Sequence, residues 1–175
     1  MEATVLTWRM SFRRLTALTL ILFPLVGSTA PRTCLVVGIA DGDTLTARCG
    51  QPDAYEQVKV RLAEIDAPEK KQPFGERSRQ SLAKLCFQRE AVLIPRTIDR
   101  YGRTVARVEC DGRDANAKQV QDGMAWAYTQ YQTDPAFPRL ELQARRARIG
   151  LWAELGTAKA PTAPWEWRRA RRGQR

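Results

Sequence analysis

The stretch that decides the fold runs over residues 34–62 and reads CLVVGIADGDTLTARCGQPDAYEQVKVRL. Its first part contains two runs of apolar and β-branched residues, 34–39 and 44–47, which have the composition of strands. Between them stands Asp41-Gly42, a dipeptide that is typical of two-residue hairpin turns. The stretch therefore predicts an antiparallel hairpin at the start of an all-β or mainly β domain.

The rest of the chain continues with short elements. Further strands are expected at residues 57–62, 91–94 and 105–108, and helices at residues 75–87, 116–122 and 139–149. Five short strands and three helices without an internal repeat predict an α+β, mainly β domain: an OB-fold five-stranded Greek-key barrel with about three helices.

The N-terminus has the pattern of a signal peptide. Three arginines precede an uncharged apolar run at residues 15–26, and small residues follow at 27–30. The run is shorter than the ~20 residues that a membrane span needs, although an uncleaved anchor is the alternative. We expect a signal peptide at 1–30, the OB-type domain at 31–156, and a Pro/Trp/Arg-rich C-terminal tail at 157–175 that is extended.

Charge and histidine content restrict the chemistry. The chain has 29 Lys and Arg against 19 Asp and Glu, a formal charge of +10, which indicates a polyanionic partner: nucleic acid or an acidic membrane surface. It has no histidine, which excludes Ser-His-Asp and Cys-His triads and the zinc motifs that contain histidine. Hydrolytic chemistry would have to use Asp, Glu, Arg, Lys or Tyr side chains, or a metal held by oxygen.

The four cysteines are expected to form disulfides in an exported chain. In a hairpin centred on Asp41-Gly42, Cys34 faces Cys49, because paired residue numbers there sum to 83. Cys86 with Cys110 then follows by elimination. A hydrogen-bonded position for the first pair would strain that bridge, and free buried thiols are the alternative to both.

Three segments concentrate acidic and basic residues: DGDT at 41–44, RLAEIDAPE at 61–69 and DRYGR at 99–103. Each alone is typical of an ordinary turn with solvated charges. Together they supply what phosphodiester hydrolysis needs without histidine. Carboxylates bind a hard cation such as Ca²⁺ and activate water, and guanidinium groups bind phosphoryl oxygens in bidentate fashion.

These segments, in this order, resemble the signature of the staphylococcal nuclease family: IxDGDT, RLxxIDAPE and DRYGR. The similarity continues through QPFGERSRQSL, GMAWAY, the GLW at a helix end and PWEWRR, so that it covers residues 36–169. Any one of the motifs is weak, whereas three in register are specific.

The resemblance implies a role for each matching residue. The Ca²⁺ ligands would be Asp43, Asp66 and the backbone carbonyl of Ala67, with Asp41 next to the cation through water. Glu69 would orient or deprotonate the attacking water, and Arg61 and Arg103 would hold the scissile phosphate. The nucleotide would lie against aromatic side chains, namely those of Tyr101, Tyr128 and Tyr131.

The resemblance further implies a Ca²⁺-dependent endonuclease that cleaves DNA and RNA and leaves 3′-phosphate ends. We expect it to be a monomer that is periplasmic or secreted and has no stable membrane association after signal cleavage. One alternative is a non-catalytic nucleic-acid-binding module on the same fold. The other is a disulfide-braced envelope protein with a basic, membrane-facing surface.

Overall fold

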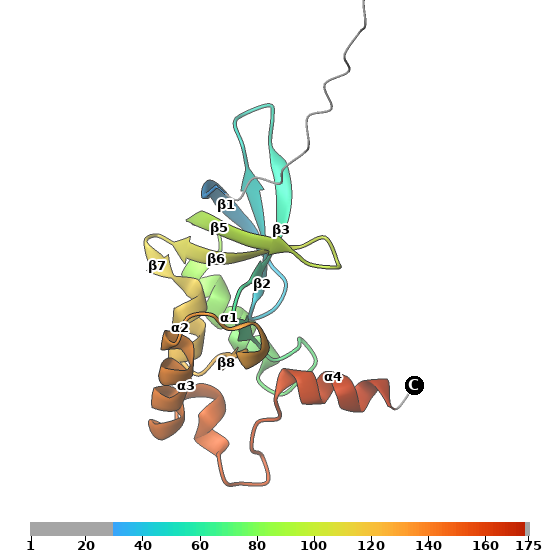
Figure 1. Cartoon of the computed structure of the whole chain (residues 1–175), viewed down its shortest axis with the longest axis vertical. Coiled ribbons are helices and arrows are strands. Elements are labelled where there is room, and N and C mark those ends of the chain that lie inside the picture. The colour runs from blue at the N-terminus through green and yellow to red at the C-terminus, as the bar shows by residue number, and fades with distance from the viewer. Residues whose placement is uncertain (1–29, 174–175) are drawn as a thin grey trace, which may run out of the picture.

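Five strands close into a barrel in the computed structural model, which describes residues 30–173 (Figure 1). The predicted signal peptide lies outside the described residues except for Ala30. Antiparallel pairing gives the order β3-β2-β1-β5-β6, and a parallel pairing of β3 with β6 closes the barrel. The strands are β1 (Arg32–Ile39), β2 (Thr44–Cys49), β3 (Glu56–Leu62), β5 (Glu90–Ile98) and β6 (Thr104–Cys110). This mixed barrel in an α+β chain confirms the predicted OB-type fold.

The interior of the barrel is filled by alternate side chains of these strands. Val36, Leu45, Val60, Leu93 and Val108 are each at most 1% exposed. Full burial of such a side chain contributes about 1.5–3 kcal/mol. The period-2 pattern read in the sequence is therefore the pattern that fills this core.

The first hairpin differs in detail from the prediction. Ala40 N donates to Thr44 O at 2.9 Å, so the connection is longer than the two residues Asp41-Gly42. A bulge between Val36 and Gly38 then restores the predicted register farther along the hairpin.

Cys34 consequently pairs with Cys49, and the two form a disulfide with their Cα atoms 4.4 Å apart. That separation is typical of a non-hydrogen-bonded pair, which removes the concern about a hydrogen-bonded position. The second predicted bridge, Cys86–Cys110, is also present and ties the end of a helix to β6.

Helices cover the lower end of the barrel in the view of Figure 1. The described residues form four α-helices rather than three: α1 (Gly75–Cys86), α2 (Ala115–Gln121), α3 (Ala136–Arg146) and α4 (Pro164–Arg172). Short elements connect them: β4 (Ile65–Asp66), β7 (Arg113–Asp114), β8 (Trp126–Ala127), and the 3₁₀ turns η1 (Thr129–Tyr131) and η2 (Gly150–Glu154). None of the helices between residues 30 and 173 has the length and apolar character needed to cross a membrane.

Two helix predictions need correction. The third helix begins at Ala136 rather than Arg139, because Asp134 accepts a hydrogen bond from Ala136 N at 2.9 Å and Pro135 precedes the first turn. The tail is helical over α4 rather than extended. Pro164 stands at its first turn, where a proline disrupts no helical hydrogen bond.

A second, smaller core holds α4 to the rest of the molecule. It contains two nearly buried tryptophans, Trp126 and Trp152, together with Ala144, Leu151 and Ala163. Trp165 of α4 packs against this cluster, with its ring 6.5 Å from that of Trp126 in an edge-to-face arrangement.

Candidate active site

The candidate site is built where the β1–β2 loop, the end of β3 and the loop after β4 meet. The β1–β2 loop is pressed against α1, and a Cβ on Gly42 would lie 1.7 Å from Ser78 Oγ. Gln119 of α2 donates to the carbonyl of Gly42 at 2.7 Å. Only glycine allows this close approach, which fixes the acidic residues on either side of it.

Asp43 is held from several directions. It is 5% exposed, and its carboxylate accepts hydrogen bonds from Thr44 Oγ1 at 3.0 Å and from Ala67 N at 2.6 Å. Its backbone carbonyl accepts from Leu62 N at 2.8 Å. The loop of Ala67 is thereby joined to the β1–β2 loop through one carboxylate.

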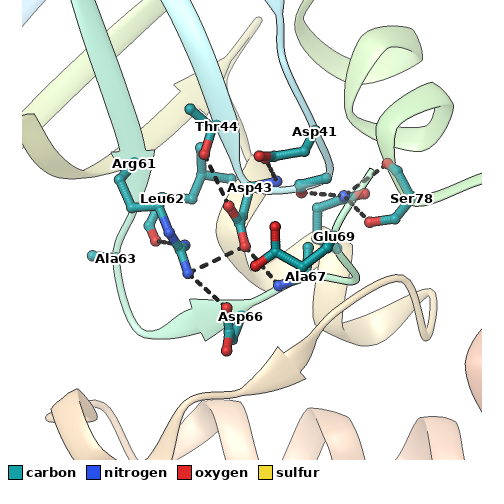
Figure 2. A network of polar contacts seen from close by, with 12 residues as sticks. Asp41, Asp43, Thr44, Arg61, Leu62, Ala63, Asp66, Ala67, Glu69 and Ser78 are labelled. Carbon is teal, nitrogen blue, oxygen red and sulfur yellow. Dashed lines mark hydrogen bonds and ion pairs between the residues drawn. The ribbon is translucent and has the colours of Figure 1, made fainter. Parts of the chain in front are cut away.

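Arg61 lies between two carboxylates, as Figure 2 shows. Its Nη2 is 3.2 Å from Asp43 Oδ2 and 3.0 Å from Asp66 Oδ1, and its Nη1 donates to the carbonyl of Leu62 at 2.8 Å. Asp66 is only 1% exposed. The structure thus brings Asp43, Asp66 and Arg61 together in one partly buried cluster.

Negative charge is in excess at this cluster. Burial, with the neighbouring Asp43 carboxylate as the next cause, raises the pKa of Asp41 from 3.8 to about 7. Burial also raises the pKa of Asp66, and hydrogen bonds from Arg168 offset part of that increase. Both shifts arise because carboxylates are crowded in a poorly solvated place, where a bound cation would stabilise their charged forms.

Glu69 lies on the loop between β4 and α1. Its backbone N–H donates to Gln72 Oε1 at 3.1 Å. A Cβ on Gly75 would lie 2.1 Å from the Glu69 carbonyl, so the start of α1 can pack onto this loop only with glycine at that position. The Glu69 side chain receives a hydrogen bond from Arg168 Nη1 at 2.8 Å.

Arg168 is the site residue that sequence reasoning missed. It comes from α4, and its Nη2 donates to Asp66 Oδ2 at 2.7 Å while its Nη1 lies 3.2 Å from Asp66 Oδ1. Burial alone would lower the pKa of Arg168, but the bonds to Asp66 and Glu69 raise it above its ordinary value. The signals in the sequence were the PWEWRR motif and the cluster of arginines in the tail, which indicate a basic segment but do not place it beside Asp66.

Arg103 and Tyr101 lie in the turn between β5 and β6. The guanidinium of Arg103 is bound to Asp99, with Nη2 at 2.7 Å from Oδ2, and stands 5.4 Å from the centre of the Tyr101 ring. Tyr101 is 67% exposed. The parallel pairing of β3 with β6 places this turn at the same end of the barrel as Arg61, because Arg61 pairs with Val105.

Tyr128 and Tyr131 lie close together at η1. Their rings are 5.3 Å apart in an edge-to-face arrangement, and Tyr128 also stacks on Trp165 at 5.7 Å. The pairing of β8 with β4, in which Asp66 opposes Trp126, brings this aromatic segment to the side of the carboxylates. Tyr128 therefore packs against α4 beside the site, whereas Tyr131 is exposed.

The donor set fits a hard cation. Among residues 30–173, no group of three or more acidic, histidine or cysteine side chains is arranged to hold a metal ion. Arg61 Nη2, however, bonds one oxygen of each of Asp43 and Asp66, so those oxygens converge on one point. Ca²⁺ takes carboxylate and water oxygens in a flexible shell, so these two carboxylates together with water are ligands that it could use.

Fold and site together define a class of protein: an OB-type barrel that carries a carboxylate–arginine site on its loops and uses no histidine. The chain belongs to the staphylococcal nuclease family, because the family model described as "Staphylococcal nuclease homologue" matches residues 59–154, more than half of the chain.

Relatives of similar length support the same assignment. An uncharacterized endonuclease of Haemophilus influenzae is 44% identical over 142 residues, which are 81% of this chain and 76% of that protein. The protein ParB of Escherichia coli is 41% identical over 151 residues (80% and 81% of the two chains). A micrococcal nuclease of Shigella flexneri is 42% identical over 146 residues (77% and 79%).

Proposed function

We propose that this protein is a Ca²⁺-dependent endonuclease that hydrolyses phosphodiester bonds of DNA and RNA and leaves 3′-phosphate ends. It is a phosphodiester hydrolase of the staphylococcal nuclease family. The observation that carries the proposal is the convergence of Asp43 and Asp66 on Arg61 at the loop edge of the barrel. This cluster unites negative groups for a cation with a positive group for a phosphate.

The cation would be held by Asp43, Asp66 and the carbonyl of Ala67, with Asp41 beside it through water. When bound, Ca²⁺ supplies electrostatic stabilisation of the negative charge that develops on the phosphoryl oxygens. Asp43 is already fixed by Thr44 Oγ1 and Ala67 N, so little rearrangement is required of that ligand.

The arginines would bind the scissile phosphate. Arg61 is 14% exposed in its side chain and presents a fork that is charged at any working pH. In the structure Arg61 is paired with the carboxylates of Asp43 and Asp66. A bound phosphate would replace them as the anionic partner of the guanidinium group. Arg103 would reach the phosphate from the β5–β6 turn, where Asp99 now holds it.

Glu69 would orient the attacking water or accept its proton. Its side chain stands at the loop edge with 39% exposure, so water has access to it. The base of the nucleotide would lie against the exposed ring of Tyr101 and against Tyr128 and Tyr131, since aromatic rings stack on any base without sequence preference.

We further infer that the chain is exported and works as a monomer. The two disulfides support an extracytoplasmic location, because such bonds persist in oxidising compartments. The proposal includes removal of residues 1–30 as a signal peptide, release into the periplasm or the medium, and a mature chain made of the domain at 31–156 and the tail at 157–175.

A chelator-controlled assay on the purified mature chain tests the proposal. EGTA should abolish cleavage of single-stranded DNA and of RNA, and excess Ca²⁺ should restore it. End-labelling before and after phosphatase treatment should detect 3′-phosphate products. Cleavage that persists in EGTA would contradict the metal requirement. Binding of nucleic acid without any cleavage would instead favour the non-catalytic module.

A further inference from the structure

The C-terminal helix α4 makes direct contact with the candidate site. Arg168 binds both carboxylate oxygens of Asp66, at 2.7 and 3.2 Å, and at the same time donates to Glu69 Oε1 at 2.8 Å. One guanidinium group thus links the residue proposed to hold the cation to the residue proposed to act on water. The two carboxylates come from β4 and from the loop that follows it.

The position of α4 is fixed by contacts of its own. Trp165 stacks on Tyr128, with the rings 5.7 Å apart and inclined by 15°. The segment that leads into α4 is joined to the Glu69 loop through Gln72, whose amide donates to Thr162 O at 2.6 Å while its carbonyl oxygen accepts from Glu69 N. Pro164 and Ala163 are buried. Arg168 is therefore carried on a docked helix and is not a free side chain on a mobile tail.

The helix carries the PWEWRR motif and lies beyond the residues that the family model matches. The family match ends at residue 154, before α4 begins at Pro164. Figure 1 shows the chain returning from the lower end of the molecule, so that the start of α4 lies beside the loop that leads into α1. The element adds a group to the site that the matched region does not contain.

We propose that Arg168 is a positioning residue of the active site, which uses Asp66 as its anchor and holds Glu69 in the geometry that hydrolysis requires. This inference rests on the proposed function. Asp66, Glu69 and Asp43 crowd negative charge at one edge of the barrel, and Arg61 compensates only the Asp43–Asp66 side. Arg168 compensates the Asp66–Glu69 side.

Glu69 depends most on this contact. Its side chain is 39% exposed, and a long exposed carboxylate explores several rotamers unless a partner fixes it. Arg168 supplies a charge-assisted hydrogen bond from a helix that is packed in place, which restricts the carboxylate to one orientation. Loss of that restriction lowers the fraction of complexes in which the water is aligned for attack, so it reduces turnover more than binding.

The test compares three substitutions at Arg168 with one control. Arg168→Gln should lower kcat about 100-fold with KM changed by no more than about threefold. Arg168→Lys, which keeps the charge but loses the fork, should lower kcat by roughly tenfold. Arg168→Ala should be restored in part by added guanidinium ions and not by methylammonium. The control Arg113→Gln removes the same charge from an exposed position on β7 and should keep kcat within about twofold of wild type.

Calorimetric titration with Ca²⁺ in the absence of substrate provides a readout other than activity. Arg168→Gln should bind Ca²⁺ at least as tightly as the wild type, because a positive charge beside Asp66 has been removed. If Arg168→Gln lowers kcat but retains the Ca²⁺ affinity and leaves the melting temperature unchanged, Arg168 acts as a positioning residue. Weaker Ca²⁺ binding by Arg168→Gln, or failure of guanidinium to rescue Arg168→Ala, would overturn the positioning role and indicate that Arg168 is only structural.

Two further outcomes separate the inference from the proposed function. If the wild type cleaves and Arg168→Gln is equally active or faster, the positioning role is wrong, and a faster variant would mean that Arg168 obstructs the site. If the wild type shows no Ca²⁺-dependent cleavage at all, the proposed function itself is wrong.

Discussion

Glu64 shows how a single buried charge organises the aromatic side of the site. It is 4% exposed and has a left-handed backbone with φ of 65°. Its Oε1 accepts from Thr133 N at 2.7 Å and from Asp134 N at 3.0 Å, and it lies 2.8 Å from Arg96 Nη1. Its backbone carbonyl accepts from Tyr128 N at 2.8 Å. One residue thus holds both ends of the segment that carries the two tyrosines.

Glu64→Gln should therefore destabilise the protein. The variant keeps an acceptor but loses the charge, which changes charge-assisted hydrogen bonds into neutral ones and should cost about 1–2 kcal/mol in the free energy of unfolding. Urea denaturation measures the change. The control Glu56→Gln removes an exposed pair with Arg32 and should cost less than about 0.5 kcal/mol. Equal stability of wild type and Glu64→Gln would show that the charge of Glu64 contributes nothing.

The stability difference between wild type and Glu64→Gln should depend on pH. Burial by itself would raise the pKa of Glu64, but hydrogen bonds from Thr133 and Arg96 outweigh it and hold the pKa below the ordinary 4.5. A lowered carboxyl pKa stabilises the folded state fully above pH 4.5, and this stabilisation is lost as pH falls through the folded-state pKa. The difference between wild type and Glu64→Gln should thus shrink below pH 4.5.

Among the elements, the two disulfides stabilise different parts of the fold. Cys34–Cys49 closes the β1–β2 hairpin with a separation of 15 residues, and Cys86–Cys110 joins α1 to β6 with a separation of 24. The second bridge supports the helix against which the Gly42 loop is packed.

Replacement of either pair by alanine should lower stability. Closure of a loop of about 15 residues is worth roughly 3 kcal/mol, and a slightly larger loss of about 3.5 kcal/mol is expected for the longer loop. Guanidinium denaturation of the two double variants measures these values. The wild type with both bridges reduced serves as the comparison and should be the least stable form. A double variant as stable as the oxidised wild type would show that its bridge adds nothing.

The helices show where local sequence patterns were sufficient and where they were not. The amphipathic pattern at residues 75–87 predicted α1, which spans Gly75–Cys86. The start of α3 depends on the hydrogen bond from Ala136 to Asp134, and the helical state of the tail depends on the packing of Trp165 onto Tyr128. Residue periodicity reports neither contact: the first is a local capping bond between residues two positions apart, and the second joins segments that meet only in the folded chain.

For the whole molecule, the charge of +10 predicts how substrate binding responds to salt. Phosphate contacts release counterions, so the affinity for a polyanion falls steeply as salt concentration rises. At saturating Ca²⁺, an increase from 50 to 200 mM NaCl should raise KM for long single-stranded DNA by roughly tenfold while kcat changes little. A dinucleotide substrate, which offers few phosphates, is the control and should respond much less. A KM that does not depend on salt would exclude a binding surface beyond the catalytic site.

The sequence by itself determined the barrel, the disulfide pairing and the chemical content of the site. Alternating apolar residues specify strands because a barrel has one inside face. The predicted pairing of Cys34 with Cys49 is present, although a bulge that the sequence did not indicate compensates for the longer turn. The absence of histidine and the three charged segments restricted the chemistry to carboxylates and arginines.

Only the tertiary structure decided which charges meet. Arg168 lies 102 residues from Asp66, and nothing in the sequence between them states that the tail returns to β4. The return depends on the second core, where Trp165 of α4 packs against Trp126. Long-range pairing of this kind is a consequence of how packed elements fit together, so the third arginine of the site became visible only in the folded chain.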